Sequence, residues 1–333
     1  MDMISERILI TGATGFVGRH LVQEFASAGR EMTLAVRALG ACPQGWRDNS
    51  RIRIVVTGPI ETANNLPDAL HGASTVVHLS GLAHASGNAG EDDPWVAANV
   101  IATEKLTTAA AAHGVRTFIH MSSLAAIARN SAPTIVDDMT CNTAPTPFGR
   151  SKREAEKRVS ALAFKGIFSI SLRPPLVVGA DAKGNWCSLQ RLAATGLPLP
   201  FGSIRNRRSL ISINSLIAAI SLLCKEKWPA TKSGDYCIAD EEIFSLPTIV
   251  SELRRGMGLS PRLFPFPTAM IDAMARMVNR QHLSAGILGD MHVDASRFRG
   301  AFGFAQKQGL AMSIFESGRK YHSSSYGEGG GTP

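Results

Sequence analysis

The sequence predicts an α/β protein in which a doubly wound parallel sheet is followed by a smaller C-terminal domain. Short apolar runs alternate with segments of helical spacing up to about residue 180, the pattern of a parallel sheet covered by helices. The first run, residues 8–10, leads into a glycine-rich turn, TGATGFVG at 11–18, that opens an amphipathic helix. Beyond residue 180 the alternation ends, which indicates a second unit.

The glycine-rich turn has the features of a dinucleotide site. Gly12 permits a tight turn, Gly15 lets the backbone approach a pyrophosphate, and Gly18 lets the helix pack closely. The free amides at the amino end of the helix would face the phosphates. The residues that we expect to touch the dinucleotide here are Gly12, Thr14, Gly15, Phe16 and Val17.

Further strands are predicted at 32–36, 52–56, 74–81, 117–121 and 168–172, and a helix over 95–112. Arg37 follows the second strand, where an arginine suits the 2′-phosphate of NADP and an acidic residue suits the ribose of NAD. Arg37 therefore favours NADP(H), and NAD remains possible. His78 lies inside an apolar run, so we expect a core histidine and not a catalyst.

Composition limits the function classes. The 333 residues are 44% hydrophobic and 19% charged, which is ordinary for a globular enzyme. No apolar run is long enough to span a bilayer and no signal core is evident, so we expect a cytoplasmic protein without membrane insertion. The net charge is +8, but the basic run at 205–208 lacks interleaved aromatics, so we expect no nucleic-acid partner. Five cysteines without a C-x-x-C pair predict no metal site.

The spacing G-x-x-G-x-x-G resembles the extended branch of the short-chain dehydrogenase/reductase superfamily, the NAD-dependent epimerase/dehydratase family, which has a Rossmann-type fold. Further likenesses are HLSG at 78–81, NVIAT at 99–103, SS at 122–123 and RPPLVVG at 173–179. The resemblance implies that the residues beside the cofactor include Leu79, Ser80, Gly81, Asn99, Ser122 and Pro174.

The segment TPFGRSKREAE at 146–156 resembles the family's Y-G-x-S-K catalytic helix, with Phe148 at the tyrosine position. The resemblance implies that Ser123 and Lys152 are catalytic, Ser123 also touching substrate and Lys152 also holding the cofactor. The family tyrosine exchanges a proton with the substrate oxygen, whereas Phe148 has none to give.

Three interpretations of Phe148 are open. It is an introduced Tyr→Phe change that inactivates the enzyme, a natural loss in a binding-only homologue, or a site where another acid substitutes. Because Lys152 and Ser123 are retained, we favour the first.

The resemblance extends to the substrate side, where His84, Asn185 and Arg208 are the expected contacts, and Arg208 would clamp a diphosphate. Residues 197–202 are interpreted as a strand and turn at the nucleotide base. A second family arginine is missing near 291–292, where Met and His stand. A helix at 269–278 has a methionine-rich face, typical of a core or subunit contact.

Together these likenesses imply reduction or oxidation at C4 of a UDP-sugar. The segments 200–210 and 146–156 are similar to bacterial UDP-4-keto-6-deoxy-N-acetylglucosamine 4-reductases of surface-polysaccharide (lipopolysaccharide O-antigen) synthesis. The alternatives are a UDP-hexose 4-epimerase and, of another class, a non-catalytic NADP(H)-binding sensor or scaffold.

We expect residues 1–180 to form the dinucleotide-binding domain, with a return at about 205–245, and 181–320 to form mainly the substrate domain. Residues 321–333 are expected to be a flexible tail. Family resemblance also predicts a homodimer formed through the helices at 95–112 and 148–162.

Overall fold

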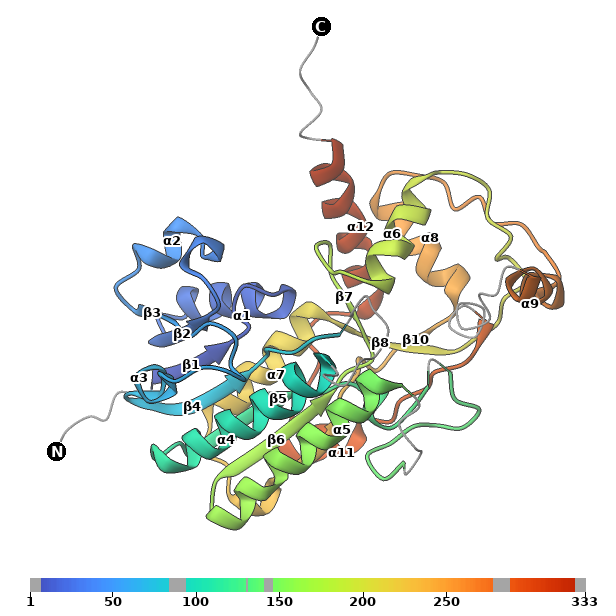
Figure 1. Ribbon diagram of the computed structural model, residues 1–333. Coiled ribbons are helices and arrows are strands. Elements are labelled where there is room, and N and C mark those ends of the chain that lie inside the picture. Colours follow the sequence, from blue (N-terminus) through green and yellow to red (C-terminus); the bar gives the residue numbers. More distant parts are fainter. Residues whose placement is uncertain (1–6, 84–93, 130, 141–145, 278–287, 327–333) are drawn as a thin grey trace, which may run out of the picture.

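The computed structural model describes residues 7–83, 94–129, 131–140, 146–277 and 288–326, and it is built around one parallel sheet with helices on both faces (Figure 1). The strand order is β3-β2-β1-β4-β5-β6-β9. The strands are β1 (Arg7–Thr11), β2 (Met32–Val36), β3 (Ile52–Val56), β4 (Ala73–His78), β5 (Thr117–Met121), β6 (Phe168–Arg173) and β9 (Gly234–Cys237). The predicted Rossmann-type α/β fold is therefore confirmed.

Apolar side chains of the strands pack against helices on both faces, as expected for a parallel sheet. One face is covered by α1 (Phe16–Ser27), α7 (Ile213–Lys225) and α11 (Ser296–Phe302). The other is covered by α3 (Leu66–Leu70), α4 (Ala102–Ala112) and α5 (Pro147–Ser160). The helix predicted at 95–112 is present and begins as a π-helical turn, η2 (Val96–Ile101).

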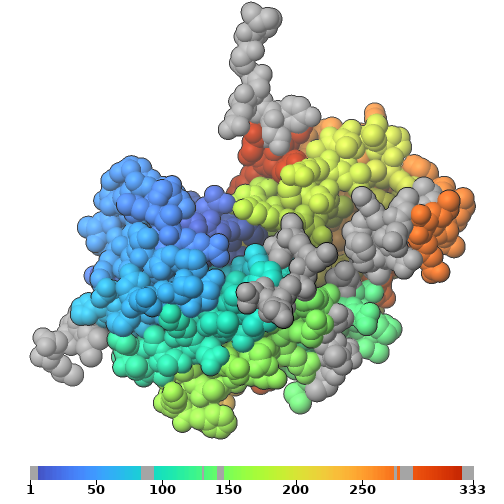
Figure 2. All heavy atoms as spheres, viewed as in Figure 1, coloured from blue at the N-terminus to red at the C-terminus, as the bar shows by residue number. Residues whose placement is uncertain are grey.

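A second group of elements follows β6. A small sheet has the order β10-β8-β7. Its strands are β7 (Leu176–Val178), β8 (Arg208–Ser212) and β10 (Ile243–Phe244). The helices of this group are α6 (Asn185–Ala194), α8 (Leu246–Gly256), α9 (Thr268–Met277) and α12 (Leu310–Tyr326). Trp186, fully buried, is in the core of this unit with residues of α8 and α12. Figure 2 shows a notch between the blue amino-terminal part and the yellow-green α6 region.

The shorter elements are α2 (Gln44–Arg47) and the 3₁₀ turns η1 (Leu39–Ala41), η3 (Leu124–Ala126), η4 (Ala161–Lys165) and η5 (Ala230–Lys232). Two later elements belong with the large sheet, because α7 packs against α1 and β9 pairs with β6. β8, although inside the range predicted to return, belongs to the small sheet.

Two local expectations were wrong. Residues 197–202 form no strand, because Leu199 makes only an isolated bridge to Leu263. The tail does not start at 321, since α12 continues to Tyr326. In α9, Met270 and Met277 are exposed (51% and 86%), so these two are not core residues, and the alternative of a subunit contact stays a prediction. Among the described residues, no helix combines the length and the apolar composition needed to cross a bilayer.

Candidate functional site

The carboxyl ends of β1, β4, β5 and β6 lie along one edge of the sheet because these strands are parallel. β1 has β2 on one side and β4 on the other, so the order of the strands reverses at β1. Ligands of open α/β sheets bind at the carboxyl ends of the strands at such a reversal. The glycine-rich turn follows β1 at this place.

Two glycines of the turn have no room for a side chain. Gly12 has φ +71°, and a Cβ there would lie 2.7 Å from the carbonyl carbon of Leu79 and from the nitrogen of Ser80. A Cβ on Gly18 would lie 2.2 Å from the carbonyl oxygen of Gly12. Gly15 is the N-cap of α1 and no side chain caps the helix, so its first amides are suited to a diphosphate. The turn therefore fits the dinucleotide expected from the sequence.

The loop after β4 lies between this turn and Lys152. Gly81 follows Leu79 and Ser80, and its position is close to two polar side chains. A Cβ on Gly81 would lie 3.0 Å from Lys152 Nζ and 2.8 Å from Asn99 Oδ1. A cofactor held by the glycine turn and the β4 loop would therefore lie near the lysine.

Asn99 joins the β4 loop to α5. Its amide is buried, accepts from the backbone nitrogen of Leu82 at 2.8 Å and donates to the carbonyl of Leu82 at 3.0 Å. The same amide nitrogen donates to Ser151 Oγ at 2.9 Å. Asn99 thus holds backbone geometry beside the site, and a direct contact of its side chain with a cofactor stays a prediction.

α5 begins at a defined cap and packs directly on the loop that carries Ser123. The Thr146 hydroxyl accepts from Gly149 N at 3.0 Å, and Pro147 occupies the first helical position. A Cβ on Gly149 would lie 2.2 Å from the carbonyl oxygen of Ala125. Glycine at this position therefore lets the start of α5 approach the chain just after Ser123.

Lys152 is buried one turn after Phe148, and its Nζ donates to the carbonyl oxygen of Met121 at 2.7 Å. Burial lowers the pKa of Lys152 to about 8, and the nearby Glu156 carboxylate opposes that shift. Near neutral pH the ammonium form still predominates, which places a positive charge at the carboxyl end of β5.

Neither Tyr236 nor Tyr321 supplies a phenol at position 148. The Tyr236 hydroxyl donates to the carbonyl of Lys232 at 2.9 Å, within the sheet core. Tyr321 packs against the core of the C-terminal unit. Phe148 itself is partly exposed. The site thus has the lysine and the serine of the expected trio but no described phenol.

The two serines after β5 have different surroundings. Ser123 is partly exposed and its Oγ accepts from Ala125 N at 3.2 Å, which caps η3. Ser122 is buried and its Oγ donates to Glu156 Oε1 at 2.6 Å. The Ser122 hydroxyl is therefore engaged by the helix, so its expected place beside the cofactor stays a prediction.

Sequence reasoning missed a buried ionic network behind these serines. Arg173 donates from Nε and Nη2 to both carboxylate oxygens of Glu156, at 2.8 and 2.7 Å. Arg173 Nη2 also lies 3.0 Å from Asp235 Oδ2, which ties β9 to the network. Burial, with the Glu156 charge, raises the pKa of Asp235 to about 6. The available signal was Glu156, one turn after Lys152 on the same helix.

His78 is a core histidine, as predicted. The Thr103 hydroxyl donates to the carbonyl of Asn99 at 2.6 Å, so its oxygen accepts from His78 Nε2 at 3.1 Å. His78 Nδ1 then accepts from the Thr11 hydroxyl at 2.7 Å. Burial, followed by the charge of Lys152, lowers the pKa of His78 to about 3. The ring is therefore neutral and braces β1 against η2 and α4.

This chain also has sequence relatives. Residues 8–239 match the NAD dependent epimerase/dehydratase family. The chain belongs to that family. A UDP-glucose 4-epimerase of Vibrio cholerae is 29% identical over 321 residues, covering 94% of this chain and 95% of the relative. A ceramide reductase of Caulobacter vibrioides is 29% identical over 280 residues, covering 82% and 79%.

Solved structures agree on the fold. The structure of a UDP-glucuronic acid 4-epimerase from Bacillus cereus in complex with NAD superposes with a TM-score of 0.72. It is 20% identical and the match covers 96% of this chain and 99% of that one. At this identity the likeness supports the epimerase/dehydratase-family fold and nothing finer.

The remaining residues predicted for this epimerase/dehydratase-family site lie on several elements. Arg37 is exposed directly after β2, and the carbonyl of Pro174 accepts from Leu124 N at 3.0 Å. Asn185 is exposed at the start of α6. His84 lies outside the described residues.

Arg208, at the start of β8, is partly buried and donates from Nη1 to the carbonyl of Gly289 at 2.9 Å. Burial lowers the pKa of Arg208, and Asp290 opposes the shift. Where a second arginine was missing from the sequence, Met291 is buried and bridges to Arg208. Within the described part of the chain, no three His, Cys, Asp or Glu side chains gather as metal ligands would.

Proposed function

We propose that this chain is an NAD(P)-dependent oxidoreductase acting at C4 of a UDP-sugar, and that it lacks the proton donor for efficient turnover. The observation that carries the proposal is the contact between Gly149 and Ala125, which sets position 148 beside the Ser123 loop. Lys152 lies one turn further along α5, next to Gly81. A hydride acceptor or donor, a proton donor and a substrate oxygen would meet at this point.

Each residue has a proposed role. The nicotinamide of the bound cofactor supplies or accepts the hydride. Lys152 would hold the nicotinamide ribose and, with a phenol at position 148, would lower the pKa of that phenol. Ser123 would donate a hydrogen bond to the oxygen on C4. Phe148 places a ring at the right position but has no proton for that oxygen.

For the substrate we propose UDP-4-keto-6-deoxy-N-acetylglucosamine, whose reduction belongs to surface-polysaccharide synthesis. Arg208, the first residue of β8 in the small sheet, would bind the diphosphate, and Asn185 would contact the nucleotide. The likeness of residues 200–210 to such 4-reductases supports this choice. The bond from Arg208 Nη1 to the carbonyl of Gly289 would hold the guanidinium in place at the start of β8.

Mass spectrometry of the reaction of this UDP-4-keto sugar with NADPH or NADH tests the proposal. The chain and its Phe148→Tyr variant are compared side by side. We expect reduced product from Phe148→Tyr and little or none from the parent. Phe148→Leu, which also lacks a hydroxyl, is the matched control. If Phe148→Tyr gives no product with any UDP-4-keto sugar, the reductase assignment fails.

A UDP-hexose 4-epimerase is the second candidate, and it uses the same site residues. It is favoured by the Vibrio cholerae relative, named UDP-glucose 4-epimerase, which this chain matches over 95% of its length. Incubating Phe148→Tyr with UDP-glucose and catalytic NAD separates the two activities, since an epimerase forms UDP-galactose without net consumption of cofactor. If neither substrate reacts while the cofactor still binds, a non-catalytic NADP(H)-binding sensor or scaffold becomes the better assignment.

We also propose a cytoplasmic homodimer formed through η2–α4 and α5. Val96 and Ile101 are large apolar residues of η2 that stay exposed (41% and 47%), which supports an intersubunit contact there. Sedimentation should report a dimer for the parent and a monomer for Ile101→Glu. A monomeric parent at micromolar concentration would remove this proposal.

A further inference from the structure

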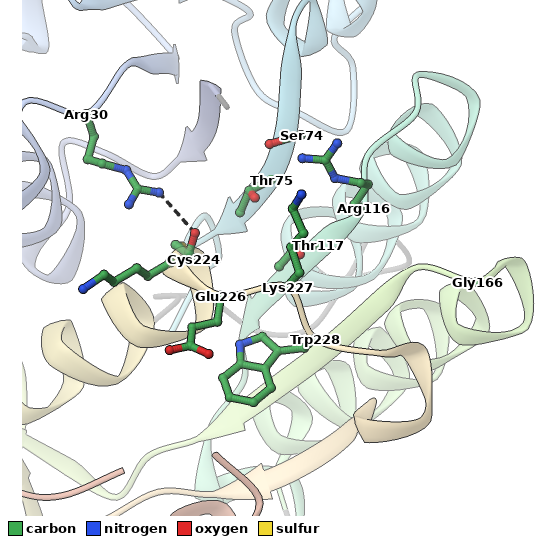
Figure 3. A pocket seen from close by; sticks show the side chains of 11 residues that line it. Arg30, Ser74, Thr75, Arg116, Thr117, Gly166, Cys224, Glu226, Lys227 and Trp228 are labelled. Atoms are coloured by element: carbon green, nitrogen blue, oxygen red, sulfur yellow. Dashed lines mark hydrogen bonds between the residues drawn. The ribbon is translucent and has the colours of Figure 1, made fainter. Parts of the chain in front are cut away.

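A pocket of about 230 Å³ lies at the opposite edge of the large sheet from the candidate site (Figure 3). Its floor is formed by the buried residues Ser74, Thr75 and Thr117, where β4 and β5 begin. Its rim is formed by the loops that precede β2 and β5 and by the chain that follows α7. The glycine turn and Lys152 lie at the carboxyl ends of the strands, so this is a separate cavity.

The rim of the pocket carries a surplus of positive charge. Arg30, Arg116, Lys225 and Lys227 line it, with Glu226 as the one carboxylate among the lining residues. Arg30 donates from Nη2 to the carbonyl of Cys224 at 3.1 Å, which fixes one guanidinium at the end of α7 (Figure 3). Several cations around one small volume favour an anion between them.

The floor of the pocket is rich in hydrogen-bond donors. The hydroxyls of Ser74, Thr75 and Thr117 can each donate one hydrogen bond. The Trp228 indole nitrogen is buried and has no hydrogen-bond partner among the described residues. An indole N–H can only donate, and leaving it unpaired costs free energy.

The ring of Trp228 is held in place by its neighbours. Lys232 Nζ lies 4.6 Å from the ring centroid, and the Phe302 ring meets it edge-on at 5.0 Å. The ring is thus held in place at the pocket before any ligand arrives. At about 230 Å³ the volume is below the 300–1,000 Å³ typical of sites for drug-sized ligands, so the ligand is small.

We propose that this pocket binds a small tetrahedral oxyanion, a phosphate or sulfate group. Arg116 and Lys227 provide the charge, and the hydroxyls of the floor provide the neutral hydrogen bonds. The site is independent of the reaction assigned to the carboxyl edge of the sheet.

Calorimetric titration of the full chain with inorganic phosphate, in the presence of saturating NADPH, tests the proposal. NADPH occupies the glycine turn, so binding that persists comes from elsewhere. We expect saturable binding of one phosphate, which sodium chloride at matched ionic strength does not reproduce. Phosphate binding that NADPH abolishes would overturn the proposal. Binding heat that never saturates would also overturn it, because it would indicate an adventitious ion only. A parallel titration with sulfate decides whether charge and shape alone suffice or protonation of the ligand matters.

Variants locate the binding. The double variant Arg116→Gln/Lys227→Gln should weaken phosphate binding about tenfold or more, since two charge-assisted contacts are lost. Arg53→Gln/Lys157→Gln removes the same net charge from exposed positions outside the pocket and should change binding by about twofold at most. Equal weakening in the two double variants would reduce the effect to net charge and refute the site.

Trp228 supplies a second readout. Phosphate should change the tryptophan fluorescence of the parent, and Trp228→Phe should abolish that change while leaving the other three tryptophans in place. Retention of the full fluorescence change in Trp228→Phe would show that the anion binds elsewhere.

Discussion

Ser122 Oγ donates to Glu156 Oε1 at 2.6 Å, inside the protein, while the neighbouring Ser123 side chain stays partly exposed at the end of β5. Two consecutive serines therefore do different work. One fastens β5 to α5 and, through Glu156, to Arg173 on β6. The other caps the short turn η3.

Replacing each serine by alanine should have different effects on stability and on turnover. Ser122→Ala leaves a buried carboxylate without one donor and should lower the free energy of unfolding by about 1–3 kcal/mol. Ser123→Ala should lower it by less than about 1 kcal/mol, because it loses only the cap of a short turn. In the Phe148→Tyr background, however, Ser123→Ala should reduce turnover about 100-fold. Urea unfolding and steady-state kinetics measure the pair, and a larger stability loss for Ser123→Ala would contradict the structure.

Gly149→Ala tests the close approach of α5 to η3. The added Cβ would meet the carbonyl oxygen of Ala125 at 2.2 Å, so one backbone must move. We expect a loss of about 1–3 kcal/mol in the free energy of unfolding. Gly300→Ala is the matched control, because Gly300 lies inside α11 with open space around a Cβ, and it should be neutral or stabilising by up to about 1 kcal/mol. Equal effects of the two changes in urea unfolding would mean that the contact is not tight.

Burial of Lys152 should appear as a pH dependence of stability. The pKa of Lys152 is lowered to about 8 in the folded chain, against about 10.4 in an unfolded one. Below pH 8 both states carry the charge, and the folded state bears the full cost of burying it. Between about pH 8 and 10.4 the folded state loses the proton first, so this cost shrinks as the pH rises.

The parent should therefore gain stability relative to Lys152→Met as the pH rises from about 8 to about 10. Taking the difference between the two proteins cancels the groups that they share. Lys157→Met, at a position where 66% of the side chain is exposed, is the control for loss of a lysine without burial. A flat difference for Lys152→Met would mean that Lys152 is solvated.

Local patterns predicted the strands of the large sheet well. The ranges expected for β2, β3 and β5 coincide with the observed ones, because buried parallel strands are short apolar runs bounded by polar turns. The prediction of a strand at 197–202 was wrong because a strand also needs a paired partner, which the local pattern does not show. The partner of Leu199 is Leu263, far along the chain, and one bridge between them does not make a ladder.

The parts of the candidate site that lie on one short segment could be predicted from the sequence. The glycine turn and the spacing of position 148 and Lys152 are local, so the sequence places them. The ionic network was missed because Glu156, Arg173 and Asp235 come from α5, β6 and β9, and their contact exists only in the folded sheet. The bracing of His78 between Thr11 and Thr103 is tertiary in the same way, although its burial was predicted from the apolar run.

Arg37 should decide the choice of cofactor. It follows β2 directly and is exposed, so its guanidinium is free to reach a phosphate on the adenosine ribose. We expect NADPH to bind more tightly than NADH, and Arg37→Asp to reverse that order by losing a charge-assisted contact and adding repulsion of the 2′-phosphate. The ratio of the two dissociation constants should change by about 100-fold, because the lost contact and the added repulsion are each expected to contribute about 1.4 kcal/mol, a factor of ten in a dissociation constant. Arg53→Asp on the neighbouring strand makes the same change of charge and should leave the ratio unaltered. Titration of cofactor fluorescence gives all the constants, and an unchanged ratio in Arg37→Asp would assign the recognition of the ribose to other residues.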